Sequence, residues 1–176
     1  MFRLFRKKDK SSETGRTGEA ANAENHDYPT APGTEIRYSP ELISDLKGEH
    51  QALLDLYTEI KTGFDNAQYE TVSELLDRFR GVLQGHLLTE NIRLYIYLER
   101  QFAHDDTNVE LIRDFRREMD QIGRTAMNFL RKYEAIGVDR DLATAFDRDF
   151  SELGEVLTQR IEREEKTLYP LYMPTY

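Results

Sequence analysis

Five polar residues stand at positions where the apolar stripes of this sequence would otherwise be continuous. They are His50, His86, Glu90, Arg160 and Glu164. Four of them form two pairs, His86-x-x-x-Glu90 and Arg160-x-x-x-Glu164, and this spacing places both side chains of a pair on one face of a helix. Imidazole and carboxylate groups together suit iron, and a buried charge is costly unless it is paired or bound to a metal. The pattern therefore predicts either a metal site or a buried polar network, and the residues alone leave both open.

An internal repeat relates these residues to one another. The stretch His86-x-x-x-Glu90-x-x-x-Leu94-Tyr95 is matched 74 residues later by Arg160-x-x-x-Glu164-x-x-x-Leu168-Tyr169. Upstream, Glu49-His50 is matched 71 residues later by Asp120-Gln121. The repeat predicts two helical hairpins, each of which presents one residue from its first helix and a spaced pair from its second.

The elements that must position these residues are four amphipathic helices. Apolar residues recur at helical spacing over 42–63, 72–103, 107–137 and 142–170, and no segment alternates as a strand would. We expect the first helix to begin at Ser39-Pro40-Glu41 and the third to begin with the capping box Thr107-x-x-Glu110. Four such helices with short connections predict an all-α fold, an up-down-up-down antiparallel four-helix bundle over residues 38–176.

Residues 1–37 differ in composition from the rest of the chain. The first ten carry five basic groups and one acid, and the following residues to 34 are mainly small or polar. Such a composition buries too little apolar area to offset the entropy of ordering. We therefore predict a disordered N-terminal arm with a basic tip. A weak contact of this tip with a membrane surface stays open.

Composition excludes several classes of function. The chain has 176 residues, a formal net charge of -9 and no cysteine. The negative charge argues against nucleic-acid binding, and the absence of cysteine excludes disulfides and thiolate metal sites. No apolar run is long enough to span a bilayer, and no phosphate-binding loop or nucleophile elbow is present. We expect a non-enzymatic, cytoplasmic protein.

The motifs that carry chemistry resemble those of the hemerythrin-like, HHE cation-binding domains. The resemblance rests on Glu49-His50, on His86-x-x-x-Glu90 and on the ending Glu164-Glu165-x-x-Leu168-Tyr169-Pro170, and it covers about residues 38–176. Members of that family hold a carboxylate-bridged di-iron centre and serve as oxygen carriers, as sensors or in iron handling. The resemblance implies that one iron takes His50 and His86, with Glu90 and Glu164 as the bridging carboxylates. If the helical phase assumed for the fourth helix is wrong by one residue, Glu165 is the ligand in place of Glu164.

The sequence departs from the family at the second iron. The resemblance places histidines at positions that hold Gln121, Thr125 and Arg160 in this chain. Arg160 cannot bind a cation, because its guanidinium stays charged at neutral pH. We expect it to reach Glu90 or Glu164 and to supply positive charge where the second metal would lie. This interpretation predicts at most one iron ion and a role in sensing or regulation instead of oxygen transport.

Two alternatives remain at this point. Leu53-Leu54-x-x-Tyr57 and Gly154-Glu155-x-Leu157-x-x-Arg160-x-x-x-Glu164 resemble anti-sigma proteins of the Rsd/AlgQ type, which implies a metal-free regulator that binds a sigma factor. A signalling protein is another possible partner. The other alternative is a complete di-iron protein that recruits Gln121, Glu118 or Asp120 as unusual ligands.

Overall fold

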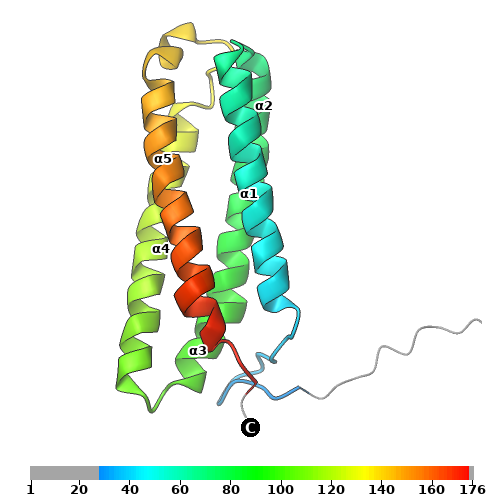
Figure 1. Cartoon of the computed structure of the whole chain (residues 1–176), viewed down its shortest axis with the longest axis vertical. Helices are drawn as coiled ribbons and strands as arrows, with labels where there is room; N and C mark the ends of the chain where they lie inside the picture. Colours follow the sequence, from blue (N-terminus) through cyan, green and yellow to red (C-terminus); the bar gives the residue numbers. More distant parts are fainter. Residues whose placement is uncertain (1–27, 175–176) are drawn as a thin grey trace, which may run out of the picture.

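The computed structural model describes residues 28–174, and it is a bundle of antiparallel helices (Figure 1). The α-helices are α1 (Leu42–Asp65), α2 (Tyr69–Thr89), α3 (Ile96–Gln101), α4 (Asp106–Lys132) and α5 (Ala143–Arg163). The π-helical segment Glu90–Tyr95 joins α2 to α3, so that these elements form one rod, and α5 continues into a second π-helical segment, Glu164–Leu168. Four rods therefore result, as the apolar periodicity predicted. No helix in this part of the chain combines the length and the apolarity that crossing a lipid bilayer requires.

Two of the predicted helix starts are wrong in detail. The first helix begins at Leu42, and no side chain caps it. The backbone N–H of Ser39 instead donates to the hydroxyl of Tyr172, 2.8 Å away. At α4 the N-cap is Asp105, whose carboxylate accepts from the backbone N–H of Asn108 at 3.1 Å. Asp105 lies ahead of the predicted capping box in extended conformation, where an aspartate is a strong cap.

The core of the bundle consists of two apolar clusters, one toward each end. The cluster near the α1–α2 and α4–α5 connections includes Ile60, Phe79, Tyr133, Phe146 and Phe150. The cluster near α3 includes Leu42, Leu98, Ile112, Leu168 and Tyr172. The buried polar residues belong to neither cluster. They lie on α1, α2, α5 and the first residues of the two π-helical segments, at sequence positions between the two clusters, so apolar layers shield them from both ends of the bundle.

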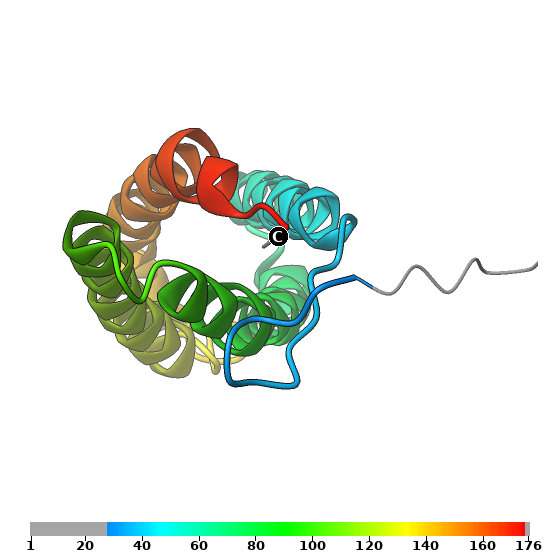
Figure 2. The same cartoon turned by 90° about the horizontal axis from the view of Figure 1, so that it is seen from below.

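The boundary predicted between arm and bundle is wrong. Residues 28–38 cross the end of the bundle near α3, as the view along the bundle shows (Figure 2). Thr30 and Arg37 form an isolated β-bridge, Ala31 is fully buried, and the ring of Tyr38 stacks on Tyr172 with centroids 4.9 Å apart. Aromatic and small apolar side chains thus anchor a segment whose polar average suggested disorder. The basic tip and the rest of the predicted arm, 1–27, lie outside the described residues.

Candidate metal centre

The structure brings together the four residues predicted to bind metal. His50 comes from α1, His86 from α2, and Glu90 and Glu164 from the first positions of the two π-helical segments. One ligand atom from each lies within 4.8 Å of those from the other three, and all four side chains are buried. The geometric part of the prediction is confirmed. Their role as ligands stays a prediction.

The two π-helical segments occupy equivalent places in the internal repeat. One begins at Glu90 and the other at Glu164, and residue i+5 is a tyrosine in both, Tyr95 and Tyr169. In an α-helix residue i+5 is rotated about 140° from residue i, whereas the wider turn of a π-helix brings it back near the same face. Each glutamate is thereby joined by a tyrosine on the inner face of its rod. The apolar periodicity gave no sign of this change in helix type.

A carboxylate holds the outer nitrogen of each histidine. Nδ1 of His50 lies 2.9 Å from Oε1 of Glu165, and Nδ1 of His86 lies 2.9 Å from Oε2 of Glu49. Nε2 of each ring consequently faces the cluster, 3.3 Å from Glu164 for His50 and 3.8 Å from Glu90 for His86. Histidines that bind metal are characteristically fixed in this way by an outer carboxylate.

Two neighbouring glutamates, Glu164 and Glu165, lie differently relative to the cluster. Glu164 is the buried residue that faces the cluster, and Glu165 is partly exposed and contacts His50 from outside. The geometry therefore favours Glu164 over Glu165 as the candidate ligand. Sequence reasoning assigned no role to Glu49, although its place beside His50 in a recognised motif was a usable signal.

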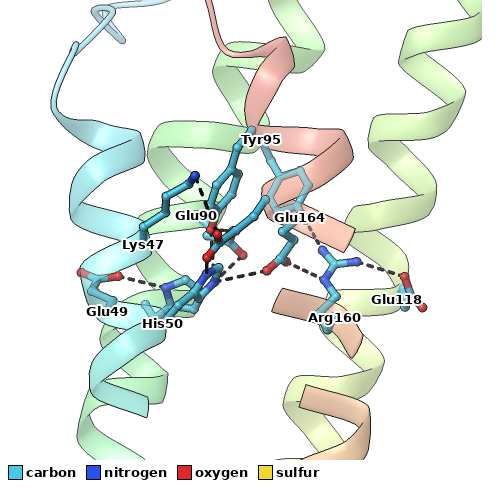
Figure 3. Close-up of polar contacts among 11 residues, drawn as sticks. Lys47, Glu49, His50, Glu90, Tyr95, Glu118, Arg160 and Glu164 are labelled. Atoms are coloured by element: carbon cyan, nitrogen blue, oxygen red, sulfur yellow. Dashed lines mark hydrogen bonds and ion pairs between the residues drawn. The ribbon is translucent and has the colours of Figure 1, made fainter. Parts of the chain in front are cut away.

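Arg160 forms the expected buried ion pair. Its Nε donates to Glu164 Oε1 at 2.5 Å, its Nη2 to the hydroxyl of Tyr95 at 2.6 Å and its Nη1 to Glu118 Oε2 at 3.0 Å. Figure 3 shows the guanidinium between Glu164 and Glu118. The guanidinium carbon also lies 4.7 Å from the centroid of the Phe115 ring. Of the two carboxylates named in the prediction, Arg160 pairs with Glu164, and this prediction is confirmed.

Burial and charge leave one carboxylate of the cluster uncompensated. Burial, together with the nearby negative charge of Glu164, raises the pKa of Glu90 well above its ordinary value. Burial also acts to raise the pKa of Glu164, but its contacts with His50 and Arg160 outweigh this and lower it. Oε2 of Glu90 is buried without a hydrogen-bond partner. A buried, unpartnered carboxylate oxygen beside an imidazole nitrogen is a position that fits a cation.

The two histidines differ in their electrostatic surroundings. Burial acts to lower the pKa of His50, but hydrogen bonds to Glu164 and Glu165 and the charges of these residues raise it overall. Burial and the proximity of His50 lower the pKa of His86. The rings lie with centroids 4.7 Å apart, so both are not readily in the cationic imidazolium form at once. This favours an unprotonated nitrogen on His86, which is the form that binds a metal.

The residues predicted as remnants of a second metal site do not reach the cluster, except Arg160. Gln121 and Thr125 lie on the exposed face of α4, because the inner face belongs to the apolar stripe of that helix. The inward residues of α4 beside the cluster are Met119, Ile122, Gly123 and Ala126. None of these carries a nitrogen or oxygen ligand in its side chain.

The complete di-iron alternative finds no support in this arrangement. Asp120 is exposed like Gln121. Glu118 is partly buried, but its two oxygens accept hydrogen bonds from Arg160 and Arg163. The unusual ligands considered for a second iron are therefore either turned outward or already paired with cations.

A small cavity adjoins the cluster on its apolar side. Its volume is about 40 Å³, and its walls combine the polar cluster with apolar residues of all four rods, among them Leu53, Phe79, Leu83 and Met119. Gly154 also lines it, and a Cβ at this position would lie 2.4 Å from the ring of Tyr57. Apolar walls of this kind keep bulk water away and strengthen the electrostatic interactions of the cluster.

The comparison with known protein families agrees with this geometry. The family model for the hemerythrin HHE cation-binding domain matches residues 41–172. No curated protein and no solved structure matches the chain significantly. The resemblance to anti-sigma proteins stays a prediction. The matched region contains all four rods and every residue of the cluster, and the chain belongs to the hemerythrin HHE cation-binding domain family.

Proposed function

We propose that this chain is a non-enzymatic protein that holds one iron ion among His50, His86, Glu90 and Glu164 and acts in sensing or regulation. The family supports cation binding in general. A set of two imidazoles and carboxylates is typical of non-haem iron sites. When bound, the iron would supply a Lewis-acidic centre with two accessible oxidation states.

The observation that carries the proposal is the orientation of the two histidines. A carboxylate engages each Nδ1 from outside the cluster, so that both Nε2 atoms face buried glutamates. A purely structural network would have no need to leave Glu90 Oε2 without a hydrogen-bond partner. Iron binding accounts for the orientation and for the orphaned oxygen together.

The position of Arg160 supports a stoichiometry of one iron ion per chain. It occupies the place in the second repeat that His86 occupies in the first, and it already neutralises Glu164. The inward face of α4 adds only apolar side chains. A second ion near this guanidinium would meet a fixed positive charge and too few ligands. We therefore place this protein outside two-metal oxygen carriers.

The alternative of a metal-free regulator that binds a sigma factor has less support. Arg160 and Glu164 are part of the pattern behind that resemblance, and both are buried and bonded to each other. Residues in this state are not available to contact a partner.

An anaerobic calorimetric titration with Fe²⁺ tests the proposal. We expect the metal-free chain to bind one equivalent and His86→Ala to lose this binding. His104→Ala is the matched control, because His104 is exposed in the turn after α3. Absence of binding in the parent chain, or equal binding by the parent and His86→Ala, would refute the assignment.

A further inference from the structure

The hydroxyl of Tyr169 lies among the ligand atoms of the candidate centre. It is 3.0 Å from Glu90 Oε1 and 3.2 Å from His50 Nε2. The side chain is buried, and its ring stacks on that of His50 with centroids 5.6 Å apart and an angle of 9° between planes. Tyr169 therefore contacts two of the four predicted ligands directly.

These two distances also suit neighbouring ligands of one ion. Two ligands at right angles, each about 2.1 Å from the metal, are about 3.0 Å apart. The Tyr169 oxygen, which donates a hydrogen bond to Glu90 here, thus lies close enough to His50 and Glu90 to bind the same ion. The π-helical turn that begins at Glu164 gives the reason, because it turns residue i+5 toward the cluster.

Tyr95, the repeat partner of Tyr169, provides an internal contrast. It also stands at i+5 after its glutamate and is fully buried. Its hydroxyl, however, accepts a hydrogen bond from Arg160 at 2.6 Å. The oxygen of Tyr95 already faces a cation, whereas that of Tyr169 faces an imidazole nitrogen and a carboxylate. Of these two tyrosines, Tyr169 faces the predicted metal ligands and Tyr95 faces Arg160.

We propose that Tyr169 is a fifth protein ligand and binds ferric iron through its phenolate oxygen, an inference that rests on the proposed iron site. In this step the O–H bond breaks, an Fe–O bond forms, the proton leaves to solvent, and no electron is transferred. A hard anionic oxygen stabilises Fe³⁺ more than Fe²⁺. Tyr169 therefore biases the centre toward the ferric state, which is a useful property for a sensor of redox conditions.

The test uses the full chain loaded with Fe³⁺ from ferric nitrilotriacetate, followed by removal of unbound iron. Ferric phenolates absorb visible light by charge transfer from the ring to the metal, and resonance Raman spectra show the ring modes. We expect this band in the parent chain and in Tyr95→Phe. In Tyr169→Phe we expect loss of the band with retention of bound iron, measured by elemental analysis.

Each other outcome has a defined meaning. A parent chain that binds Fe³⁺ without the band overturns the tyrosine assignment but leaves the proposed iron site intact. A band that persists in Tyr169→Phe overturns it as well. A parent chain that binds no iron overturns both proposals. If Tyr169→Phe does not fold, the parent and Tyr95→Phe still decide: a missing band in the parent, or its loss in Tyr95→Phe, contradicts the assignment to Tyr169.

Discussion

The two hairpins of this bundle share a backbone plan and differ in their charges. The first, from α1 to α3, presents His50, His86 and Glu90. The second, from α4 to the π-helical segment after α5, presents Arg160 and Glu164 in the repeat positions of His86 and Glu90. In each hairpin the second helix changes from an α-helix to a π-helix at its glutamate, which is Glu90 in the first and Glu164 in the second. The backbone of the two hairpins is therefore alike at these positions, while the first hairpin presents histidine where the second presents arginine.

The difference shows two ways to compensate a buried carboxylate. Glu164 is neutralised within the protein by Arg160 and has a lowered pKa despite its burial. Among residues 28–174, no cationic group is in hydrogen-bond contact with Glu90, and burial and the charge of Glu164 raise its pKa well above the ordinary value. A guanidinium is a permanent counter-charge, whereas a metal ion can be taken up and released. In the proposed iron site, the first hairpin is the responsive half of the centre and the second is the fixed half.

Removal of the fixed charge should have the largest effect on stability. Arg160→Ala leaves Glu164 buried with an unsatisfied charge, and breaking a buried pair at one end costs about 3–5 kcal/mol. The free energy of unfolding, measured in urea, should fall by that amount. Arg163→Ala is the control, because Arg163 also binds Glu118 but is half exposed, and its loss should cost under about 1 kcal/mol. Equal losses in the two variants would contradict the fixed-charge account.

Removal of the metal should have the next largest effect. Because only the folded chain assembles ligands from three rods, iron at one hundred times its Kd should stabilise the fold by about 2.7 kcal/mol. His86→Ala should abolish this increment, measured as the difference in thermal unfolding with and without iron. A His86→Ala protein that loses stability equally in both conditions would identify His86 as an ordinary hydrogen-bonded core residue.

The carboxylates that orient the histidines should tune the affinity of the centre for iron. Glu49→Gln removes the charge that orients His86, and loss of such a partner lowers metal affinity about 10- to 100-fold. Competition with a chelator measures this change. Glu59→Gln is a matched control on the same helix, since Glu59 is half exposed and pairs with Arg78 at the surface. Affinity unchanged by Glu49→Gln would remove Glu49 from the centre.

The smallest effect on stability is expected for Asp149, an ion-paired carboxylate that lies outside the metal-binding cluster. Hydrogen bonds from Lys132, Tyr133 and Arg148 hold the pKa of Asp149 well below its usual range. A depressed folded pKa means that the stabilisation is present above the unfolded pKa, about 3.9, and declines as the pH falls below it. For this largely solvent-screened group we expect under about 1 kcal/mol.

Urea unfolding of the parent chain and of Asp149→Asn at several pH values checks this pH dependence. The stability gap between parent and variant should be widest at neutral pH and should narrow from about pH 4 downward. A gap that widens on acidification would show that the sign of the linkage is wrong. The comparison with Arg160→Ala then separates a screened ion pair from a buried one within the same hairpin.

Most of the fold follows from the sequence because apolar spacing alone dictates it. The four rods, the convergence of His50, His86, Glu90 and Glu164, and the pair between Arg160 and Glu164 were all predictable. The rods and the Arg160–Glu164 pair rest on spacing within one helix, and the convergence rests on the seam positions of the four residues together with the family resemblance. The helical period determines which residues of one helix share a face, whatever the helix packs against.

The parts that failed depend on relationships between helices. The offset that located Gln121 assumed that the first helices of the two hairpins keep the same phase, but on α4 Met119 and Ile122 face inward and Gln121 is exposed. The pairing of Glu49 with His86 crosses from α1 to α2, and no spacing within one helix reveals it. The π-helical turns escaped prediction because they insert a local change of period into continuous apolar stripes.

The iron content of the chain, purified from iron-replete cells without added chelator, tests the central claim most directly. Elemental analysis against protein concentration should give one iron per chain, with Arg160 in place of a second ion. Two irons per chain would show that the guanidinium does not substitute for a metal, and a chain without iron would show that the cluster is a structural polar network.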